Sequence, residues 1–527
     1  MKKKGKNTMK RALSLLLAVL FCATLLVGCG EPNDESVVDN NDVSDVEDNV
    51  VTTVPGSDAV LSDDTTSPAP ETQSPTDENG YLKDDLDPGL NYNGEKFTIL
   101  YWEDNGREEF NASEQSGALV EDALYNRDVM VQDRLGVEFE WVGSVGNFGN
   151  MAVYVAAVEN DVKADGEYDV FASYSQTAAT LALQGLSRDL MNVNHINFDQ
   201  PWWPKSLTEL STVNDRLYFC SGDISTTLLN MMYCTFFNKD LAEELQLGDI
   251  YKIVDDGKWT LDKLSELGSI AYWDVNGNTI CDSYDRFGVS LGSSVHFDAF
   301  YNAAGLITVD KDSGGTPVVA ADFSSEKTQN LLEKVVDIFH GSTYAAFPDT
   351  VSGWKNKTFA TGQALFMIDR NYVISTMSDI TLPYGVLPVP KYDEAQDGYY
   401  TCMAFPFTMY SISIASSEEK ADMSAAVLEC MASESYRQVT PAVFEVSMKL
   451  KYATSAADSR MYDLIREAVL LDFGRLFNSP LELIPCMAFR NACINGQTNW
   501  SAIFKAQGRV MEQSLENIVE TLNNRAS

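Results

Sequence analysis

One stretch of the sequence has the residue spacing of a calcium-binding loop. In DVNGNTICDSYD, residues 274–285, oxygen-bearing groups recur at the positions that coordinate the ion in such loops: Asp274, Asn276, Asn278, the carbonyl of Ile280, Asp282 and Asp285. Thr279 stands where the loop usually has glycine, and Asp285 is shorter than the usual glutamate. The stretch therefore predicts either a structural calcium ion or an Asx-rich surface turn, and no cofactor is expected to be required.

A second stretch, GVSLG at 288–292, has the pattern of a hydrolase nucleophile centred on Ser290. Such an enzyme needs an acid and then a histidine downstream, but only His296 and His340 follow. His296 is too close, and His340 ends an amphipathic helical pattern, where it suits the helix dipole. The sequence also lacks HExxH, Walker and GxGxxG motifs. We therefore predict no catalytic residues, although two of the many carboxylates could serve a glycosidase.

Aromatic and polar side chains follow three predicted strands where each strand ends. After FTILY (97–101), YDVFA (168–172) and ALFMI (364–368) come Trp102, Asp104 and Arg107, then Tyr174 and Gln176, then Asp369, Arg370 and Tyr372. Ligands of open α/β sheets bind at the carboxyl ends of strands. Sugars suit these residues, because C–H faces stack on rings while hydroxyls meet carboxylates, amides and guanidinium groups. Each residue alone could be core or a cap, but the three junctions together predict a ligand site.

Strand patterns alternate with helical ones along the chain. MYSISI (409–414) is a fourth strand pattern, and apolar residues recur with helical period before Gly136 and before Gly341. This alternation predicts an α/β fold with largely parallel sheets. About 435 residues follow the N-terminal region, enough for two lobes rather than one core.

The N-terminus predicts export. A basic head precedes an apolar run, Leu15–Val27, and then Gly28 and Cys29; the run is too short for a stable membrane span. The ending Leu26-Val27-Gly28-Cys29 resembles a bacterial lipobox, in which the peptide is cut before a cysteine that carries diacylglycerol. We predict a signal peptide at 1–28 and a lipid on Cys29 at the extracellular face of the cell membrane. An ordinary signal or an uncleaved anchor is the alternative.

Residues 29–90 predict an acidic, disordered tether, because they are rich in Asp, Glu, Ser, Thr and Pro and poor in large apolar groups. The net charge of −39 argues against nucleic acid as a partner. The seven cysteines beyond Cys29 show no CxxC motif and no framework spacing. We predict free buried thiols, with one bridge as the alternative.

Several segments, in shared order over about residues 91–525, resemble the family 1 extracellular solute-binding proteins of bacterial ABC importers, the group that includes maltose-binding protein. They are YDVFASYSQTAATLALQGLSRDL, LLNMMYCTFFNKDLAEELQL, FATGQALFMIDRNYV, YGVLPVPKYDE and MAFRNACINGQTNWSAIFKAQ. The resemblance implies a class II periplasmic-binding-protein-like fold, with two lobes that close on a ligand about crossing strands. Lobe 1 would hold about 91–223 and 401–460, and lobe 2 about 224–400 and 461–527.

The resemblance also carries over individual positions. Asp104 and Arg107 match the polar loop after the first strand, Gln176 a polar contact position, and Tyr372 the stacking aromatic; Asp223 lies near the first crossing and Arg490 at a matching arginine. Cys486 and Met487 replace an aromatic pair of maltose-binding protein, which argues against malto-oligosaccharide specificity. The adjacent Trp202 and Trp203 predict either replacement stacking or packing under a loop.

Together these observations predict a lipid-anchored, monomeric component that captures a sugar or oligosaccharide and delivers it to an ABC permease. An exported glycan hydrolase is the alternative, and so is a sensor or adhesin without import. Turnover of substrate would identify the hydrolase.

Overall fold

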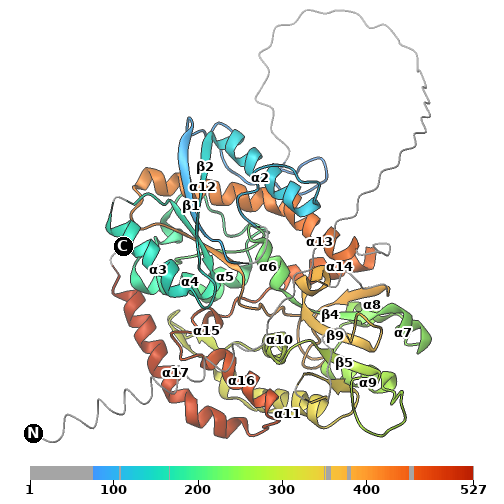
Figure 1. The fold of residues 1–527 in the computed structure, drawn as a ribbon. Helices are drawn as coiled ribbons and strands as arrows, with labels where there is room; N and C mark the ends of the chain where they lie inside the picture. The colour runs from blue at the N-terminus through green and yellow to red at the C-terminus, as the bar shows by residue number, and fades with distance from the viewer. Residues whose placement is uncertain are drawn as a thin grey trace, which may run out of the picture. The chain divides into compact units, whose positions relative to one another are not determined.

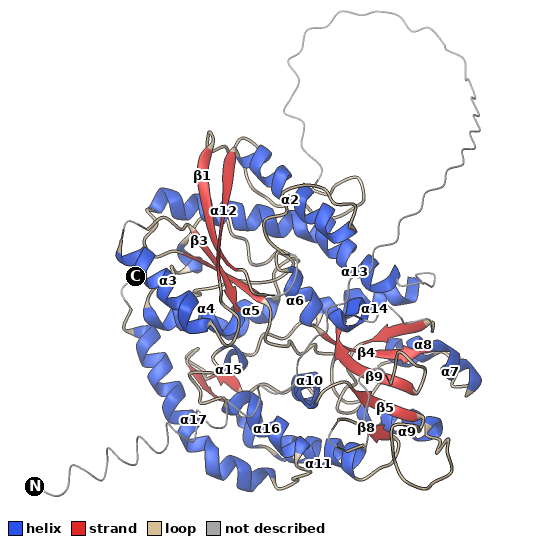
Figure 2. Cartoon of the chain, in the orientation of Figure 1, coloured by secondary structure: helices blue, strands red, loops and turns tan. Residues whose placement is uncertain are grey.

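Two β-sheets, each covered by helices, organise the chain (Figures 1 and 2). The computed structural model describes residues 75–105, 109–164, 166–348, 350–351, 358–376, 382–449 and 456–525. The predicted signal peptide, Cys29, the tether as far as residue 74, and Arg107 lie outside these residues. The predictions for them stay predictions.

The first sheet has the strand order β11-β3-β1-β2. Its strands are β1 (Glu95–Trp102), β2 (Val137–Ser144), β3 (Val170–Tyr174) and β11 (Thr408–Ile412). Around it pack α2 (Leu119–Leu135), α3 (Met151–Lys163), α4 (Ser175–Gln184) and α12 (Glu418–Glu434). Alternate side chains of β1 enter different cores: Phe97 and Ile99 share one with α2, whereas Leu100 and Trp102 share another with α3 and α4. This sheet with its helices is lobe 1.

The second sheet has the order β10-β4-β9-β5-β8. Its strands are β4 (Tyr233–Asn238), β5 (Phe287–Leu291), β8 (Ala345–Ala346), β9 (Ala364–Arg370) and β10 (Tyr384–Leu387). With it belong α7 (Lys239–Glu244), α8 (Ile250–Asp255), α9 (Leu261–Ala271), α10 (Asp298–Ala303), α11 (Glu326–His340), α15 (Phe473–Leu476) and α16 (Ile484–Ile494). This sheet with its helices is lobe 2. Further elements include the helices α5 (Lys205–Ser211) and α13 (Thr440–Lys449), the short helical turns η2 (Ser294–Phe297) and η4 (Asn371–Thr376), and the hairpin β6 (Val309–Lys311) with β7 (Pro317–Val319).

Strand direction differs from the prediction of largely parallel sheets. β1 is parallel to β2 and β3, and β5 is parallel to β8 and β9. However, β11 runs antiparallel to β3, and β4 runs antiparallel to both β9 and β10. The antiparallel strands lie next to the segments that pass between the lobes, so their direction follows from where the chain enters each sheet.

Two segments cross between the lobes. The first, 220–232, contains α6 (Thr226–Met231), and the second is 402–408. Isolated bridges pair Met232 with Met403 between the crossings, and Cys220, at the start of the first crossing, with Tyr410 of β11 just beyond the second. The paired crossings confirm the predicted two-lobe organisation.

The C-terminal helix α17 (Trp500–Asn523) contacts both lobes. At its start, the Trp500 ring packs against Phe323 and Phe489. Just beyond its end, the Arg525 guanidinium lies 5.5 Å from the ring centre of Tyr218, and the Arg525 carbonyl accepts a hydrogen bond from Arg216 at 2.7 Å. The helix therefore joins lobe 2 to lobe 1 independently of the crossings.

Two predicted boundaries need correction. Residues 75–90, predicted as the end of the tether, pack on lobe 1: Asp84 binds Arg134 of α2 through two contacts of 2.6 and 2.7 Å, and Leu86 is buried in the core. The prediction missed these few anchoring side chains because it rested on the acidic composition of the whole segment. In addition, the boundary at residue 460 falls inside α14 (Ala456–Glu467), a continuous helix that packs on β10 of lobe 2.

The seven cysteines of the described residues are free, and all but the half-buried Cys281 are buried. The predicted free thiols are thus confirmed. None of the helices in the described ranges combines the length and the apolar character needed to cross a membrane.

Candidate functional site

Asp104 follows β1 and holds the loop that follows β2. Its Oδ1 accepts hydrogen bonds from the backbone N–H groups of Gly146 at 2.7 Å and Asn147 at 2.8 Å, and its Oδ2 accepts one from Asn150 at 2.8 Å. Both carboxylate oxygens are therefore engaged within the protein. In this structure Asp104 positions the loop 145–150.

That loop presents an aromatic ring which the sequence analysis missed. Phe148 is 58% exposed, although most large apolar side chains of lobe 1 are buried. Its ring centre lies 6.4 Å from that of Tyr174, in an edge-to-face arrangement. No motif marks Phe148. The available signal was its place among glycines directly after a strand, the same kind of position as the three junctions that were selected.

Tyr174 and Gln176 lie at the end of β3 and the start of α4. Both are buried, and Gln176 Nε2 lies 3.5 Å from the Tyr174 hydroxyl. The Oε1 atom of Gln176 is buried without a hydrogen-bond partner among the described residues. Leaving an amide oxygen buried and unpaired is costly, so this atom marks a place where a ligand donor would be stabilised.

Trp102 proves to be a core residue. It is 1% exposed, its ring centre lies 5.6 Å from that of Tyr174, and its indole N–H donates to Thr408 Oγ1 at 2.8 Å. Trp102 therefore packs against Tyr174 and supports its ring. The Trp102 ring is covered in this structure, and its expected stacking on a ligand stays a prediction.

Lobe 2 contributes a buried carboxylate clasped by two arginines. Asp298 contacts Arg490 at 2.7 and 2.5 Å and Arg475 at 3.2 Å, and Cys486 Sγ lies 3.2 Å from its Oδ2. Burial raises the pKa of Asp298, but the two guanidinium groups outweigh it and bring that pKa below its usual range. Asp298 is therefore ionised and paired.

Tyr174 and the Asp298 cluster influence each other electrostatically. Burial raises the pKa of Tyr174, the Cys486 thiol adds to that rise, and Arg490 and Arg475 oppose it. Arg475 also lies 4.6 Å from the ring centre of Phe405 and donates to the Met403 carbonyl at 3.0 Å, both in the second crossing. Residues of both lobes thus meet beside the crossings.

Asp369 and Arg370, at the end of β9, belong to the same neighbourhood. Asp369 is buried, and its Oδ1 accepts from the Arg370 N–H at 2.6 Å and lies 3.2 Å from His296 Nε2. The Arg370 guanidinium lies 5.4 Å from the ring centre of Tyr372. Burial lowers the pKa of His296, so its imidazole is neutral at neutral pH.

Tyr233 on β4 is near both lobe 2 groups, the Asp298 cluster and the pair Asp369 and Arg370. Its ring centre lies 5.6 Å from that of His296, and burial raises the pKa of its hydroxyl well above the usual value. Asp298 raises this pKa further, whereas Arg370 and Arg490 lower it, so all three charges are near Tyr233. We call Phe148, Tyr174, Gln176, Tyr233, Asp298, Arg370, Asp369, Tyr372 and Arg490 the interlobe site.

Asp223 and the tryptophan pair at 202–203 lie outside the interlobe site. Asp223 is buried and bound to Arg466 of α14 at 3.3 and 3.4 Å, so its charge is already compensated. Trp202 and Trp203 are buried and donate their indole N–H groups to Glu429 at 3.2 and 2.9 Å. Of the two interpretations of the tryptophan pair, packing is correct and stacking on a ligand is not.

The stretch 274–285 forms a loop turned by its own side chains. Asp274 accepts from the backbone N–H groups of Gly277 at 2.7 Å and Thr279 at 2.8 Å, and Asn276 and Asn278 accept from the N–H groups two residues further on. Thr279 has a φ of 62°, in the left-handed region that glycine favours. The residue whose type argued against a calcium loop therefore adopts the backbone conformation that the turn needs.

Asp285 closes this loop from inside the protein. It is 0% exposed, and its Oδ2 accepts from the Tyr272 hydroxyl and from the Asp282 N–H, each at 3.2 Å. Its Oδ1 is buried without a hydrogen-bond partner. No three His, Cys, Asp or Glu side chains of the described ranges lie close enough to hold a metal ion by themselves. An ion here would thus depend on the amide and carbonyl oxygens as well.

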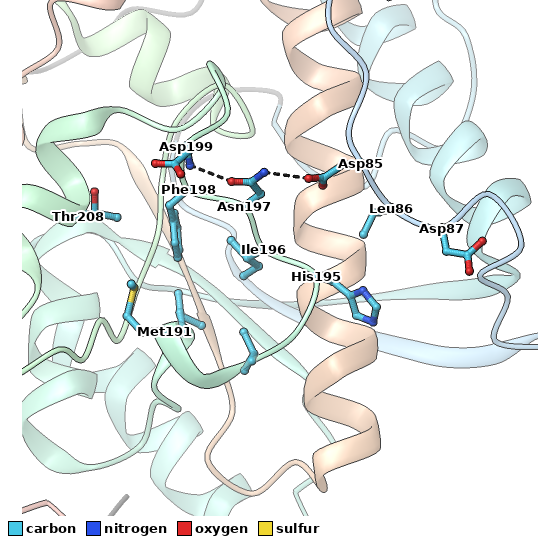
Figure 3. Close-up of a pocket in the computed structure, with 12 residues that line it drawn as sticks. Asp85, Leu86, Asp87, Met191, His195, Ile196, Asn197, Phe198, Asp199 and Thr208 are labelled. Carbon is cyan, nitrogen blue, oxygen red and sulfur yellow. Dashed lines mark hydrogen bonds between the residues drawn. The ribbon is translucent and has the colours of Figure 1, made fainter. Parts of the chain in front are cut away.

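A separate hollow of about 590 Å³ lies on lobe 1 between residues 85–87 and residues 190–208 (Figure 3). Asn197 crosses one side of it, donating to Asp85 at 2.9 Å and accepting from the Asp199 N–H at 3.1 Å. None of the predicted ligand residues lines this hollow, so we do not assign the ligand to it.

Comparison with solved structures finds similarity over most of the chain. A cyclic alpha-maltosyl-1,6-maltose binding protein from Arthrobacter globiformis has 14% identity and a TM-score of 0.53, covering 81% of this chain and 99% of its own. UspC from M. tuberculosis has 12% identity and a TM-score of 0.51, covering 80% and 100%. A family 1 extracellular solute-binding protein from Bifidobacterium longum subsp. infantis has 12% identity and a TM-score of 0.50, also covering 80% and 100%.

Comparison with protein-family models and with curated proteins finds no match. At these identities the structural similarity establishes the fold. The chain has the fold of the two-lobe extracellular solute-binding proteins, as the sequence resemblance predicted.

Proposed function

We propose that this protein captures a sugar or oligosaccharide at the interlobe site, as the extracellular binding component of an ABC importer. The observation that carries the proposal is the pairing of the exposed Phe148 ring with the buried, unpartnered Oε1 of Gln176 around Tyr174. An apolar face beside a fixed acceptor suits a saccharide, which has both C–H faces and hydroxyl donors.

The charges of the site favour a neutral ligand. Arg490 is paired with Asp298, and Arg370 contacts Asp369. Because these guanidinium groups are already compensated by carboxylates, a charged ligand would have to displace a buried partner, at a cost of several kcal/mol. The cyclic alpha-maltosyl-1,6-maltose binding protein is a carbohydrate-binding example of the same fold.

Two parts of this proposal rest on the sequence. The cysteine that follows the apolar run, Cys29, would carry the lipid that holds the protein at the outer face of the membrane. An ABC permease would then receive the ligand from the closed lobes. Attachment of a radiolabelled fatty acid to the wild-type chain, and its loss in Cys29→Ser, would test the anchor.

Ligand binding is tested by thermal unfolding of the chain from residue 30 onward, against neutral oligosaccharides, amino acids, peptides and polyamines. A ligand at 100 times its dissociation constant adds about 2.7 kcal/mol of stability, which gives a clear shift. We expect a shift with one class of neutral glycan and no product by chromatography. Product formation would favour the glycan hydrolase, and a shift with polyamines alone would contradict the proposed ligand class.

Matched variants locate the binding. Gln176→Ala removes the unpartnered acceptor and Phe148→Ala removes the exposed ring, so each should weaken glycan binding by about tenfold. Phe148→Tyr keeps the ring and should bind normally. If both alanine variants bound the glycan as tightly as the parent chain, the interlobe site would be wrongly placed.

We also propose that the loop 274–285 binds calcium as a structural ion. The left-handed Thr279 and the unpartnered Oδ1 of Asp285 support this, because both suit a loop that wraps an ion. Calorimetry with Ca²⁺ alone should detect one site on chelator-treated protein, with a matching rise in unfolding temperature. Asp285→Asn should lose both signals, and Glu266→Gln, exposed and outside the loop, should keep them. Absence of heat and of any rise in temperature would leave the stretch as a surface turn.

A further inference from the structure

Glu109 places a buried carboxylate between the two crossings. It is 1% exposed, and its Oε1 accepts from the Ser225 hydroxyl at 3.0 Å and the Thr227 N–H at 3.4 Å. Its Oε2 accepts from the hydroxyls of Thr227 at 2.9 Å and Thr408 at 2.6 Å. One side chain thus joins Ser225 and Thr227 of the first crossing to Thr408, where the second crossing enters β11 of lobe 1.

Glu109 belongs to lobe 1. It follows β1 in the chain, and the next residue, Phe110, packs its ring against Tyr101 of β1 and Trp141 of β2. Trp102, the last residue of β1, donates to the same Thr408 hydroxyl. The Glu109 side chain therefore holds residues 225–227 against Thr408 and the end of the first sheet.

Lobe 2 holds the crossings a few residues away. Asn371, directly after β9, donates from Nδ2 to the Leu229 carbonyl at 3.4 Å and from its backbone N–H to the Met232 carbonyl at 2.9 Å. In the second crossing, Arg475 donates to the Met403 carbonyl, whereas Ser175 of lobe 1 donates to the Phe405 carbonyl at 2.6 Å. The attachment of the first crossing changes within α6, between Thr227 and Leu229, and that of the second changes between Met403 and Phe405. Ala404, between these two, donates its N–H to the Met231 carbonyl of the first crossing at 3.0 Å.

We infer that Glu109 is a positioning residue for ligand capture, which holds the first crossing to lobe 1 beside the start of β11, so that lobe rotation is absorbed on the lobe 2 side of Thr227 and Phe405. Only the effect on ligand affinity rests on the proposed function, since the contacts of Glu109 with the crossings exist without ligand. A hinge must absorb its backbone changes over a few residues, and well-held flanks determine which residues those are. Ligand affinity then depends on Glu109 although this residue is outside the interlobe site.

Hydrogen–deuterium exchange on the ligand-free chain from residue 30 onward tests the attachment directly. Glu109→Ala should speed exchange of peptides covering 225–232 and 403–409 by about tenfold or more, because buried hydrogen bonds to Ser225, Thr227 and Thr408 are lost. Glu109→Gln keeps one acceptor oxygen and should lie between the parent chain and the alanine variant. If Glu109→Ala fails to fold, Glu109→Gln alone decides the comparison.

The matched control is Glu429→Gln, which changes another buried carboxylate but one that ties elements within lobe 1. The Trp202 carbonyl also accepts from the Asp223 N–H near the start of the first crossing, but Glu429→Gln should leave exchange of the peptides covering 225–232 and 403–409 unchanged. Equal acceleration in the two glutamine variants, or no change at the crossings in Glu109→Gln, would overturn the inference. The outcome is independent of the glycan screen, so failure of the proposed function and failure of this inference are distinguishable.

Discussion

Glu429 lies beneath two indole rings in lobe 1, and burial raises its pKa from the usual 4.5 to about 8. The folded protein therefore holds a proton on Glu429 that the unfolded chain releases. Its contribution to stability is complete below pH 4.5 and is lost as the pH rises toward 8, at up to about 1.4 kcal/mol per pH unit. In denaturant titrations between pH 4.5 and 8, the free energy of unfolding of Glu429→Gln should fall less steeply with pH than that of the parent chain. Parallel slopes in variant and parent would contradict the raised pKa.

The positions of the site residues were partly predictable from sequence. Tyr174 and Gln176 were selected because they follow a predicted strand, and the structure places them at the end of β3 and the start of α4; their role in ligand binding stays a prediction. Asp104 was selected for the same reason, but its oxygens are taken by Gly146, Asn147 and Asn150, some 42 to 46 residues away in the chain. Local patterns cannot reveal such partners, and for the same reason they could not reveal the exposed Phe148.

At the scale of elements, the segment 75–90 is held in part by the ion pair of Asp84 with Arg134 of α2. Asp84 has a fully buried side chain, and Arg134 is its partner. Asp84→Ala should lower the free energy of unfolding by about 2 kcal/mol and expose the segment to proteases, because Arg134 loses its charged acceptor. Glu78→Ala, at an exposed position of the same segment, should change neither. A protease pattern unchanged by Asp84→Ala would mean that the packing of Leu86 suffices.

The helices and strands themselves were well predicted where their periodicity was strong. The helical pattern ending at Gly136 is α2, and this glycine has a φ of 61°, a conformation in which it is favoured as a helix end. The four strand patterns correspond to β1, β3, β9 and β11. Strand direction was not predictable in the same way, since it depends on which neighbour a strand meets after the chain has crossed between lobes.

At the scale of the molecule, the two lobes follow from chain length and from the order of segments shared with solute-binding proteins. The start of the folded region was placed too late, because an acidic composition dominated residues 75–90 despite Leu86 and Tyr81. The ring of Tyr81 packs edge-to-face on Tyr436 with centres 5.5 Å apart. A few anchoring contacts thus decide whether a polar segment joins a folded body.

The C-terminal helix has a mechanical consequence. Its 24 residues span about 36 Å, with Trp500 embedded in lobe 2 and Arg525 resting on Tyr218 of lobe 1. If the lobes rotate about the crossings, the Trp500 end of the helix stays with lobe 2, and the contact between Arg525 and Tyr218 of lobe 1 shifts. The C-terminal end of the helix would then move across the surface of lobe 1 as the angle between the lobes opens.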